Sequence, residues 1–199
     1  MPTPTSPAGP SPDPVALVAD LRRWGAELGF QQVGVAGTAL PEAEQRLAAW
    51  LAAGYHGEMG WMAAHGSKRS RPAELVPGTL RVICARFDYW PAAASAAADV
   101  LADPARAYLA RYSLGRDYHK VLRGRLRTLA ARLAAVAGPA GYRVFVDSAP
   151  VLEKPLAAAA GLGWIGKHTN LINAEAGSWF LLGEIFTDLP LPVDAPATD

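Results

Sequence analysis

The sequence predicts an α/β protein, a sandwich in which helices flank a central mixed or antiparallel sheet. Apolar runs of strand type alternate along the chain with segments of helical periodicity. Residues 118–136 carry apolar side chains spaced four, three, four and three residues apart, which defines one buried helix face. The run SWFLLGEIF, residues 178–186, has bulky side chains at odd and even positions, as a central strand covered on both faces requires.

Composition restricts the class of protein. The chain has 199 residues, 51% of them apolar, and a formal charge of +1, so it is long enough for one domain with a sizeable core. A nucleic-acid partner would have to be held by a local patch. There is no apolar run of about 18 residues, and the start, MPTPTSPAGPSPDP, lacks the features of a secretory signal. We therefore expect a cytoplasmic protein with no membrane contact.

The first quarter of the chain predicts a tail, a helix, a strand and a second helix. Residues 1–12 are typical of a disordered Pro/Ser tail. A helix is expected after Asp13, an N-cap followed by proline, and its stop is Gly29. The segment QQVGVAG predicts a short strand, and a helix opening at Pro41 should end near Gly54.

The middle of the chain predicts a strand, an insertion and the longest helix. LRVICARFDY is a strand with side chains on both faces, and it contains the single cysteine, Cys84, which we expect in the core. One cysteine excludes an internal disulfide and any all-cysteine metal site built by this chain alone. Residues 91–103 are an Ala-rich insertion without a clear pattern, and the helix over 118–136 follows.

The last third predicts a strand YRVFV, a helical stretch over 151–160, a turn GLGWIGKHT, a strand near NLIN, and the central strand. The end, DLPLPVDAPATD, is rich in proline and is typical of a linker. We therefore expect a folded domain over 13–187 and a linker over 188–199.

Asp147 is the first candidate for chemistry. Period-two alternation in YRVFV puts Arg143, Phe145 and Asp147 on one face, with the carboxylate at the carboxyl end of the strand. Strand ends are where α/β folds place groups that contact ligands. The functional interpretation needs a carboxyl group desolvated enough to raise its pKa toward neutrality. The alternative is that Asp147 or Ser148 caps the helix that begins near Pro150.

Two further segments combine groups of a binding site. GLGWIGKHTN places three glycines beside donors at its end, and the alternative is an ordinary turn with a solvated Lys-His pair. RYSLGRDYHKVLRGRLR carries a basic stripe that suits an anionic partner, with aromatic groups before it, and its alternative is a solvated helix flank. The stripe consists of Arg116, Lys120, Arg123 and Arg127.

Metal ligation by the chain's own side chains is not predicted. His56 and His65 have no second metal-type residue four positions away, so zinc is not expected. Asp117 and His119 match the start of the Asp-x-His-x-x-Gly cobalt-ligand motif, but position 122 is Leu, and we reject that assignment. The segment YHGEMGWM fits core packing as well as a pocket wall.

The segments together resemble the epoxyqueuosine reductase family of cobalamin-dependent tRNA-modification enzymes. The matching runs are YHGEMGWM, LVPGTLRVICARFDY, ARYSLGRDYHKVLRGRL, YRVFVDSAPVLEKPLA and AGLGWIGKHTNLINAEAGSWFLLGEIFTDLPLP. They stand in family order and cover nearly everything from about residue 15 to 194.

This resemblance implies a fold, an activity and a site. Family members bind cobalamin in a nitroreductase-like N-terminal domain, take electrons from two 4Fe-4S clusters in a ferredoxin-like domain, and reduce epoxyqueuosine in the tRNA anticodon loop. Asp147 would be the acid that protonates the substrate oxygen. The basic stripe would meet tRNA phosphates. The cofactor would contact Arg71, Tyr112, Asp117, Tyr118, His119, Ser148, Gly166, Lys167, His168 and Thr169.

The chain departs from the family at its end. Family enzymes continue into cysteine-rich runs that bind the clusters, whereas this chain has one cysteine and two clusters need eight thiolates. We expect a monomer that binds cobalamin and relies on a separate iron-sulfur or electron-donor protein. The alternatives are a non-catalytic cobalamin- or RNA-binding module of the same origin, and a nitroreductase-like flavin protein.

Overall fold

The fold is built on a four-stranded sheet. The computed structural model describes residues 12–90, 95–138 and 140–197. Neighbouring strands all run antiparallel, so the antiparallel form of the predicted sheet is the one observed. The strand order is β1 (Gln32–Ala36), β2 (Arg81–Asp88), β6 (Phe180–Thr187) and β3 (Tyr142–Phe145).

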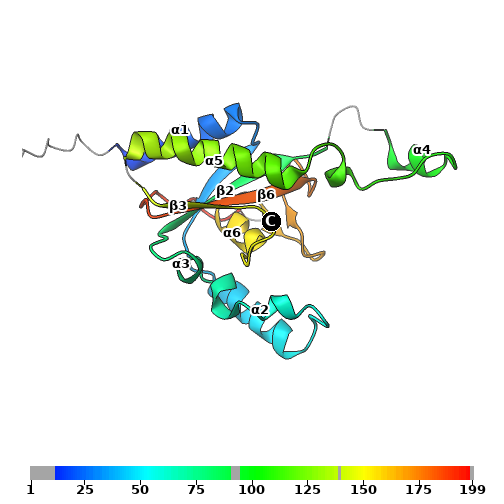
Figure 1. Ribbon diagram of the computed structural model, residues 1–199, viewed down its shortest axis with the longest axis horizontal. Helices are drawn as coiled ribbons and strands as arrows, with labels where there is room; N and C mark the ends of the chain where they lie inside the picture. The colour runs from blue at the N-terminus through cyan, green and yellow to red at the C-terminus, as the bar shows by residue number, and fades with distance from the viewer. Residues whose placement is uncertain (1–11, 91–94, 139, 198–199) are drawn as a thin grey trace, which may run out of the picture.

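Helices α1 (Pro14–Glu27) and α5 (Tyr118–Ala137) cover one face of this sheet (Figure 1). The Asp13 carboxylate accepts a hydrogen bond from the amide of Val15, which confirms the predicted N-cap. The leucines of the α5 repeat are buried against apolar side chains of all four strands. We call this the apolar face, because every buried residue of its cluster is hydrophobic.

Helix α6 (Glu153–Ala159) and a small hairpin cover the other face, which we call the α6 face. The hairpin pairs β4 (Trp164–Ile165) with β5 (Leu171–Ile172), so the stretch predicted as a turn contains a short strand. Cys84 is fully buried on this face, as predicted, and its thiol pKa is raised by burial. Gly34 allows the end of α6 to approach β1, because a Cβ there would lie 2.1 Å from the carbonyl oxygen of Ala160.

A peripheral lobe follows β1 and stands apart from the sheet (Figure 1). Tyr55 and Trp61 are 72% and 61% exposed, so of the two interpretations of YHGEMGWM the core-packing one is wrong. No residue of the first helix of this lobe is buried. The lobe contains α2 (Pro41–Ala52), η1 (Gly60–Met62), η2 (Gly66–Arg69) and α3 (Pro72–Leu75).

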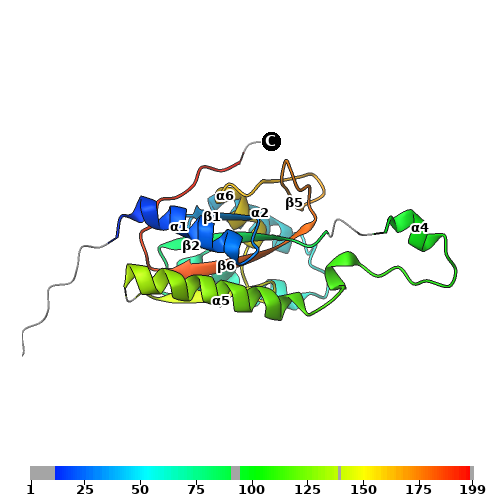
Figure 2. The same ribbon diagram turned by 90° about the horizontal axis from the view of Figure 1, so that it is seen from above.

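Two other segments complete the described chain. The insertion contains α4 (Ala97–Leu101), which projects to one side of the molecule (Figure 2), and η3 (Arg111–Ser113) follows the insertion. Residues 188–197 run back beside β1, where Asp194 binds the amide of Val35 through its carboxylate at 2.8 Å. The expectations for residues 1–11 and 91–94 lie outside the described residues. No helix among the described residues has the length and apolarity to cross a membrane.

Candidate functional site

Asp147 lies where the edge strand β3 turns toward α6. Its backbone adopts φ = 57°, a left-handed conformation that non-glycine residues rarely occupy. The carboxylate Oδ2 accepts a hydrogen bond from the Tyr118 hydroxyl at 2.7 Å and lies 3.1 Å from His119 Nε2. The capping alternative is wrong, because the N-cap of α6 is Leu152 and no side chain caps that helix.

His119 bridges two carboxylates. Its Nδ1 lies 2.9 Å from Asp117 Oδ1, and its Nε2 faces Asp147. Asp117 is also the N-cap of α5, and the hydrogen bond from the His119 side chain lowers the pKa of Asp117. A neutral imidazole has one N–H, whereas the protonated ring has two. Only the doubly protonated ring donates a hydrogen bond to both carboxylates.

The desolvated carboxyl groups near β3 and α6 belong to Glu153 and Glu184, and not to Asp147 as predicted. The side chain of Asp147 is 59% exposed, so its expected desolvation is not observed in this chain. Burial instead raises the pKa of Glu153 to about 7 and raises that of Glu184 well above its usual value. Sequence reasoning missed both residues. The signal was present for Glu184, the one carboxylate inside an apolar central strand.

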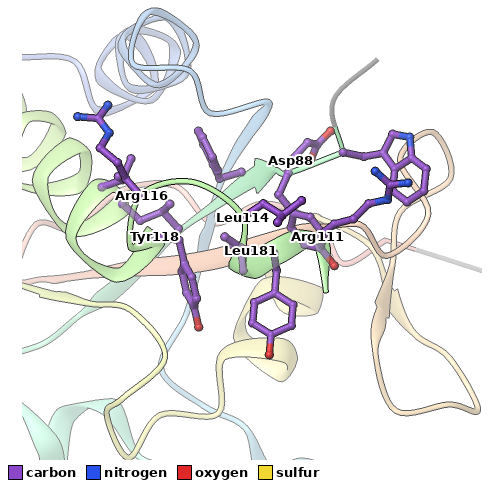
Figure 3. A pocket seen from close by; sticks show the side chains of 12 residues that line it. Asp88, Arg111, Leu114, Arg116, Tyr118 and Leu181 are labelled. Carbon is purple, nitrogen blue, oxygen red and sulfur yellow. The ribbon is translucent and has the colours of Figure 1, made fainter. Parts of the chain in front are cut away.

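An aromatic row leads away from Asp147 along the start of α5. The Tyr118 ring stacks on His119 with centroids 4.0 Å apart, and the contacts continue edge to face through Tyr112 and Tyr89 to Trp179. Burial, together with the hydrogen bond to Asp147, raises the pKa of Tyr118. The row borders a hollow of about 330 Å³. Figure 3 shows Tyr118, the first residue of α5, and Arg116, which precedes the helix, extending in opposite directions.

Lys154 connects the 161–170 loop to the Asp147 corner. Its ammonium group donates to the carbonyl of Thr169 at 2.9 Å and to Asn170 Oδ1 at 3.1 Å, while the preceding residue, Glu153, accepts from the Asp147 amide. Thr169 has φ = 67°, and its amide donates to the carbonyl of Gly166. Lys167 and His168 stand exposed on the loop. Two predicted segments therefore meet at the start of α6.

The basic stripe is solvent-accessible, and part of it lines a separate groove. Among the described residues, no carboxylate forms an ion pair with its four side chains, as the salt bridges of the protein show. Arg123 and Arg127 line a groove of about 570 Å³ together with Arg143 and Ser148. This groove combines cationic groups with a hydroxyl, a suitable composition for binding an anion.

Arg71 does not join the Asp147 cluster in this structure. Its guanidinium donates to Glu44 at 2.7 Å and to Glu74 at 2.9 Å, and it lines a hollow of the peripheral lobe. These ion pairs tie α2 to α3. Among the described residues there is also no group of three or more His, Cys, Asp or Glu side chains that would hold a metal ion directly.

The fold and this cluster define a class of protein: an antiparallel α/β sandwich that presents a hydrogen-bonded Asp–His–Tyr cluster beside an open aromatic hollow. Residues 69–148 match the family described as "Epoxyqueuosine reductase QueG, DUF1730". The chain is 63% identical over 188 residues to an epoxyqueuosine reductase of Pseudomonas aeruginosa, covering 94% of this chain and 52% of the relative. It is 55% identical to that of Escherichia coli, covering 92% of this chain and 48% of the relative.

These similarities mean that the chain belongs to the epoxyqueuosine reductase family and spans about half the length of the curated relatives it matches. Solved structures share the fold. A complex of epoxyqueuosine reductase with an epoxyqueuosine-modified tRNA stem loop superposes with a TM-score of 0.80 at 23% identity, over 94% of this chain and 49% of that one.

Two other solved structures also match the fold of this chain. In a Bacillus subtilis epoxyqueuosine reductase, also at TM-score 0.80 and 23% identity over 94% of this chain and 49% of that one, an aspartate-bearing catalytic loop is swung out of the active site. A reductive dehalogenase whose structure suggests a mechanism for B12-dependent dehalogenation matches at TM-score 0.55 and 18% identity, over 98% of this chain and 23% of that one.

Proposed function

We propose that this chain is the cobalamin-binding part of an epoxyqueuosine reductase and that Asp147 is its acid. The observation that carries the proposal is the Asp147 carboxylate, held by Tyr118 and His119, in a chain 63% identical to an enzyme of that name. The folded body would be residues 13–187. Its substrate would be the epoxyqueuosine of a tRNA anticodon loop, which the stem-loop complex of a structural relative supports.

The chemistry that the cluster suits is proton delivery to an epoxide. Converting an epoxide to an alkene and water consumes two electrons and two protons. A carboxylic acid at position 147 would protonate the ring oxygen as the carbon–oxygen bond breaks. The resulting carboxylate would remain hydrogen-bonded to the Tyr118 hydroxyl, and His119 Nε2 lies within reach to return a proton. Asp117 would hold the imidazole in place from its other nitrogen.

The residues present fit a large flat cofactor with a polar rim. A corrin ring needs broad contact surfaces and many hydrogen-bonding groups for its amides. The aromatic row offers a broad contact surface, and the exposed Lys167 and His168 offer hydrogen-bonding groups. Bound cobalamin would supply reducing equivalents to the substrate carbon. The hollow beside Tyr118 measures about 330 Å³, so it would take only part of the cofactor.

Electrons would reach the site from another protein or domain. The sequence has one cysteine, Cys84, which is fully buried and cannot form a cluster site alone. The second candidate function, a non-catalytic cobalamin- or RNA-binding module, is favoured by this same observation. The two functions differ in one property: only the enzyme converts epoxyqueuosine once electrons are supplied chemically.

The test combines cobalamin binding with turnover. The chain would be titrated with cobalamin by absorbance, then given a low-potential reductant and an epoxyqueuosine-modified RNA stem loop. We expect Asp147→Asn to bind cobalamin like the wild type while turnover falls by about 10²-fold or more, as for loss of a general acid.

Asp99→Asn is the matched control, because Asp99 is exposed on α4, and it should keep full turnover. Wild-type turnover in the Asp147→Asn variant would remove Asp147 from the mechanism. Cobalamin binding with no wild-type turnover would favour the binding module. Absence of cobalamin binding, or a bound flavin spectrum, would overturn the assignment.

A further inference from the structure

A second carboxylate, that of Glu153, hydrogen-bonds to the backbone of the turn that carries Asp147. Glu153 Oε1 accepts a hydrogen bond from the Asp147 amide at 2.6 Å, across the turn between β3 and α6. Asp147 has left-handed backbone angles, which persist where the surrounding structure imposes them. Among the described residues, this is the one hydrogen bond that the Asp147 backbone makes to a side chain. Glu153 therefore holds the backbone from which the Asp147 carboxyl projects.

Glu184 lies directly behind Glu153. It is fully buried in the central strand β6, between Cys84 of β2 and Phe145 of β3. Neither of its carboxyl oxygens has a hydrogen-bond donor among the described residues. The Glu153 and Glu184 carboxyl groups are close enough for each to shift the pKa of the other. A hydrogen bond between two carboxyl groups requires a proton on one of them.

Burial assigns that proton to Glu184. Loss of hydration penalises the charged form, and Glu184 is the more deeply buried of the two. The surrounding groups agree. The Asp147 amide and the Lys154 ammonium lower the pKa of Glu153 only, whereas the Asp147 carboxylate raises the pKa of both glutamates. The other titratable groups facing the pair are the Tyr118 hydroxyl on α5 and the Cys84 thiol on β2, which are both neutral near pH 7.

We propose that Glu153 is the positioning residue of Asp147, and that it shares one proton with Glu184 so that its own ionisation tightens its hold on the Asp147 amide. An ionised carboxylate accepts an amide hydrogen bond more strongly than a protonated one. The placement of Asp147 then depends on pH around neutrality, through groups that touch no substrate. The label "acid" for Asp147 rests on the proposed function, whereas the carboxyl pair and its hold on the corner do not.

The test is a pH titration of the chain by nuclear magnetic resonance, which needs neither cofactor nor turnover. With labelled glutamate carboxyl carbons and backbone nitrogens, we expect the Glu153 carboxyl to titrate near pH 7 while Glu184 stays protonated through that midpoint. The Asp147 amide resonance should move with the midpoint of Glu153. In Glu153→Gln, that movement of the Asp147 amide should disappear.

Two substitutions of Glu184 distinguish a proton shared by Glu153 and Glu184 from a mere effect of their closeness. Glu184→Gln keeps a donor toward Glu153, so the Glu153 midpoint should stay within about half a pH unit. Glu184→Leu removes the donor and keeps the apolar surroundings, so that midpoint should rise by about one unit. Exposed Glu175→Gln is the control and should change neither resonance.

A Glu153 carboxyl that titrates below about pH 5.5 in the wild type would overturn the proposal. So would an Asp147 amide whose pH dependence survives in Glu153→Gln. If Glu184→Leu does not fold, the wild-type and Glu184→Gln titrations still decide. Wild-type turnover by Asp147→Asn would refute the proposed function, whereas the titrations of the wild-type chain do not depend on turnover, so the two failures are distinguishable.

Discussion

The two faces of the sheet differ in what they bury. On the apolar face, hydrophobic side chains of α1 and α5 pack against the strands. The α6 face has a hydrophobic cluster as well, but it also encloses Glu184 and Arg86, which are 0% and 5% exposed. An apolar face favours folding at every pH, whereas an enclosed carboxyl group makes stability depend on protonation. The difference indicates that packing on the apolar face stabilises the fold independently of pH, whereas the contribution of the α6 face depends on pH.

The largest effect is expected from a cavity in the apolar face. Leu126 is fully buried on α5, and Leu126→Ala should lower the free energy of unfolding by about 2–5 kcal/mol. Chemical denaturation measures it. The Glu153 midpoint should stay near its wild-type value in this variant, because no atom of Leu126 belongs to the α6 face. A shifted midpoint would break the separation between the faces.

The second effect concerns the pH dependence of stability. The folded-state pKa values of Glu153 and Glu184 are raised, so above about pH 4.5 the native chain binds more protons than the unfolded chain. The unfolding free energy should therefore fall as pH rises, by at most about 1.4 kcal/mol per pH unit for each proton. For Glu153 the loss levels off above about pH 7. Glu184→Gln should flatten the decline measured by denaturation from pH 6 to 9, and an unchanged slope would contradict it.

The third effect tests the solvent side of α5. Double charge reversal of Arg123 and Arg127 should weaken RNA stem-loop binding and reduce the dependence of log K on log salt by about 0.7–0.9 per lost phosphate contact. Fluorescence titrations at several salt concentrations measure both. Arg46→Glu on α2 is the control, since that residue is exposed in the peripheral lobe. Equal losses in control and double variant would indicate general electrostatics instead of a defined groove.

The smallest effect tests the residue that joins the two faces. Tyr118 packs at the edge of the apolar face, and its hydroxyl reaches Asp147. Tyr118→Phe removes one hydrogen bond to a partly exposed carboxylate, so stability should change by about 1 kcal/mol or less. When electrons are supplied chemically, the loss of turnover, expressed as a free energy, should exceed the loss of unfolding free energy. A variant with full turnover would show that the hydroxyl does not orient Asp147.

The sequence contains enough information for most of the architecture. Leucine spacing in α5 and double-sided bulk in β6 each follow from the periodicity that burial imposes, and both elements are confirmed. The edge position of β3 was not predictable, because pairing order depends on contacts between distant segments. The place of the exposed YHGEMGWM segment stayed open for a similar reason: Met and Trp composition does not say whether a neighbour covers these side chains.

The candidate site also has features that the sequence reveals and features that it does not. Asp147 and the residues 117–119 were predicted as separate candidates, but the 2.7 Å contact between Tyr118 and Asp147 joins positions 29 residues apart, which no local pattern reveals. Glu153 lies in the first turn of α6, where an acidic residue is common, so its position carries no signal of a special role. Glu184 carried a readable signal, since a carboxylate in a two-sided apolar strand must be protonated or paired.

The seclusion of Cys84 has a practical consequence. It is the single thiol of the sequence, it lies fully enclosed, and its raised pKa keeps it from forming the reactive thiolate. A cysteine engineered at an exposed position, such as Asp99→Cys on α4, would react alone with a maleimide dye. The folded chain is therefore ready for single-site fluorophore or spin labelling without first removing a native sulfhydryl.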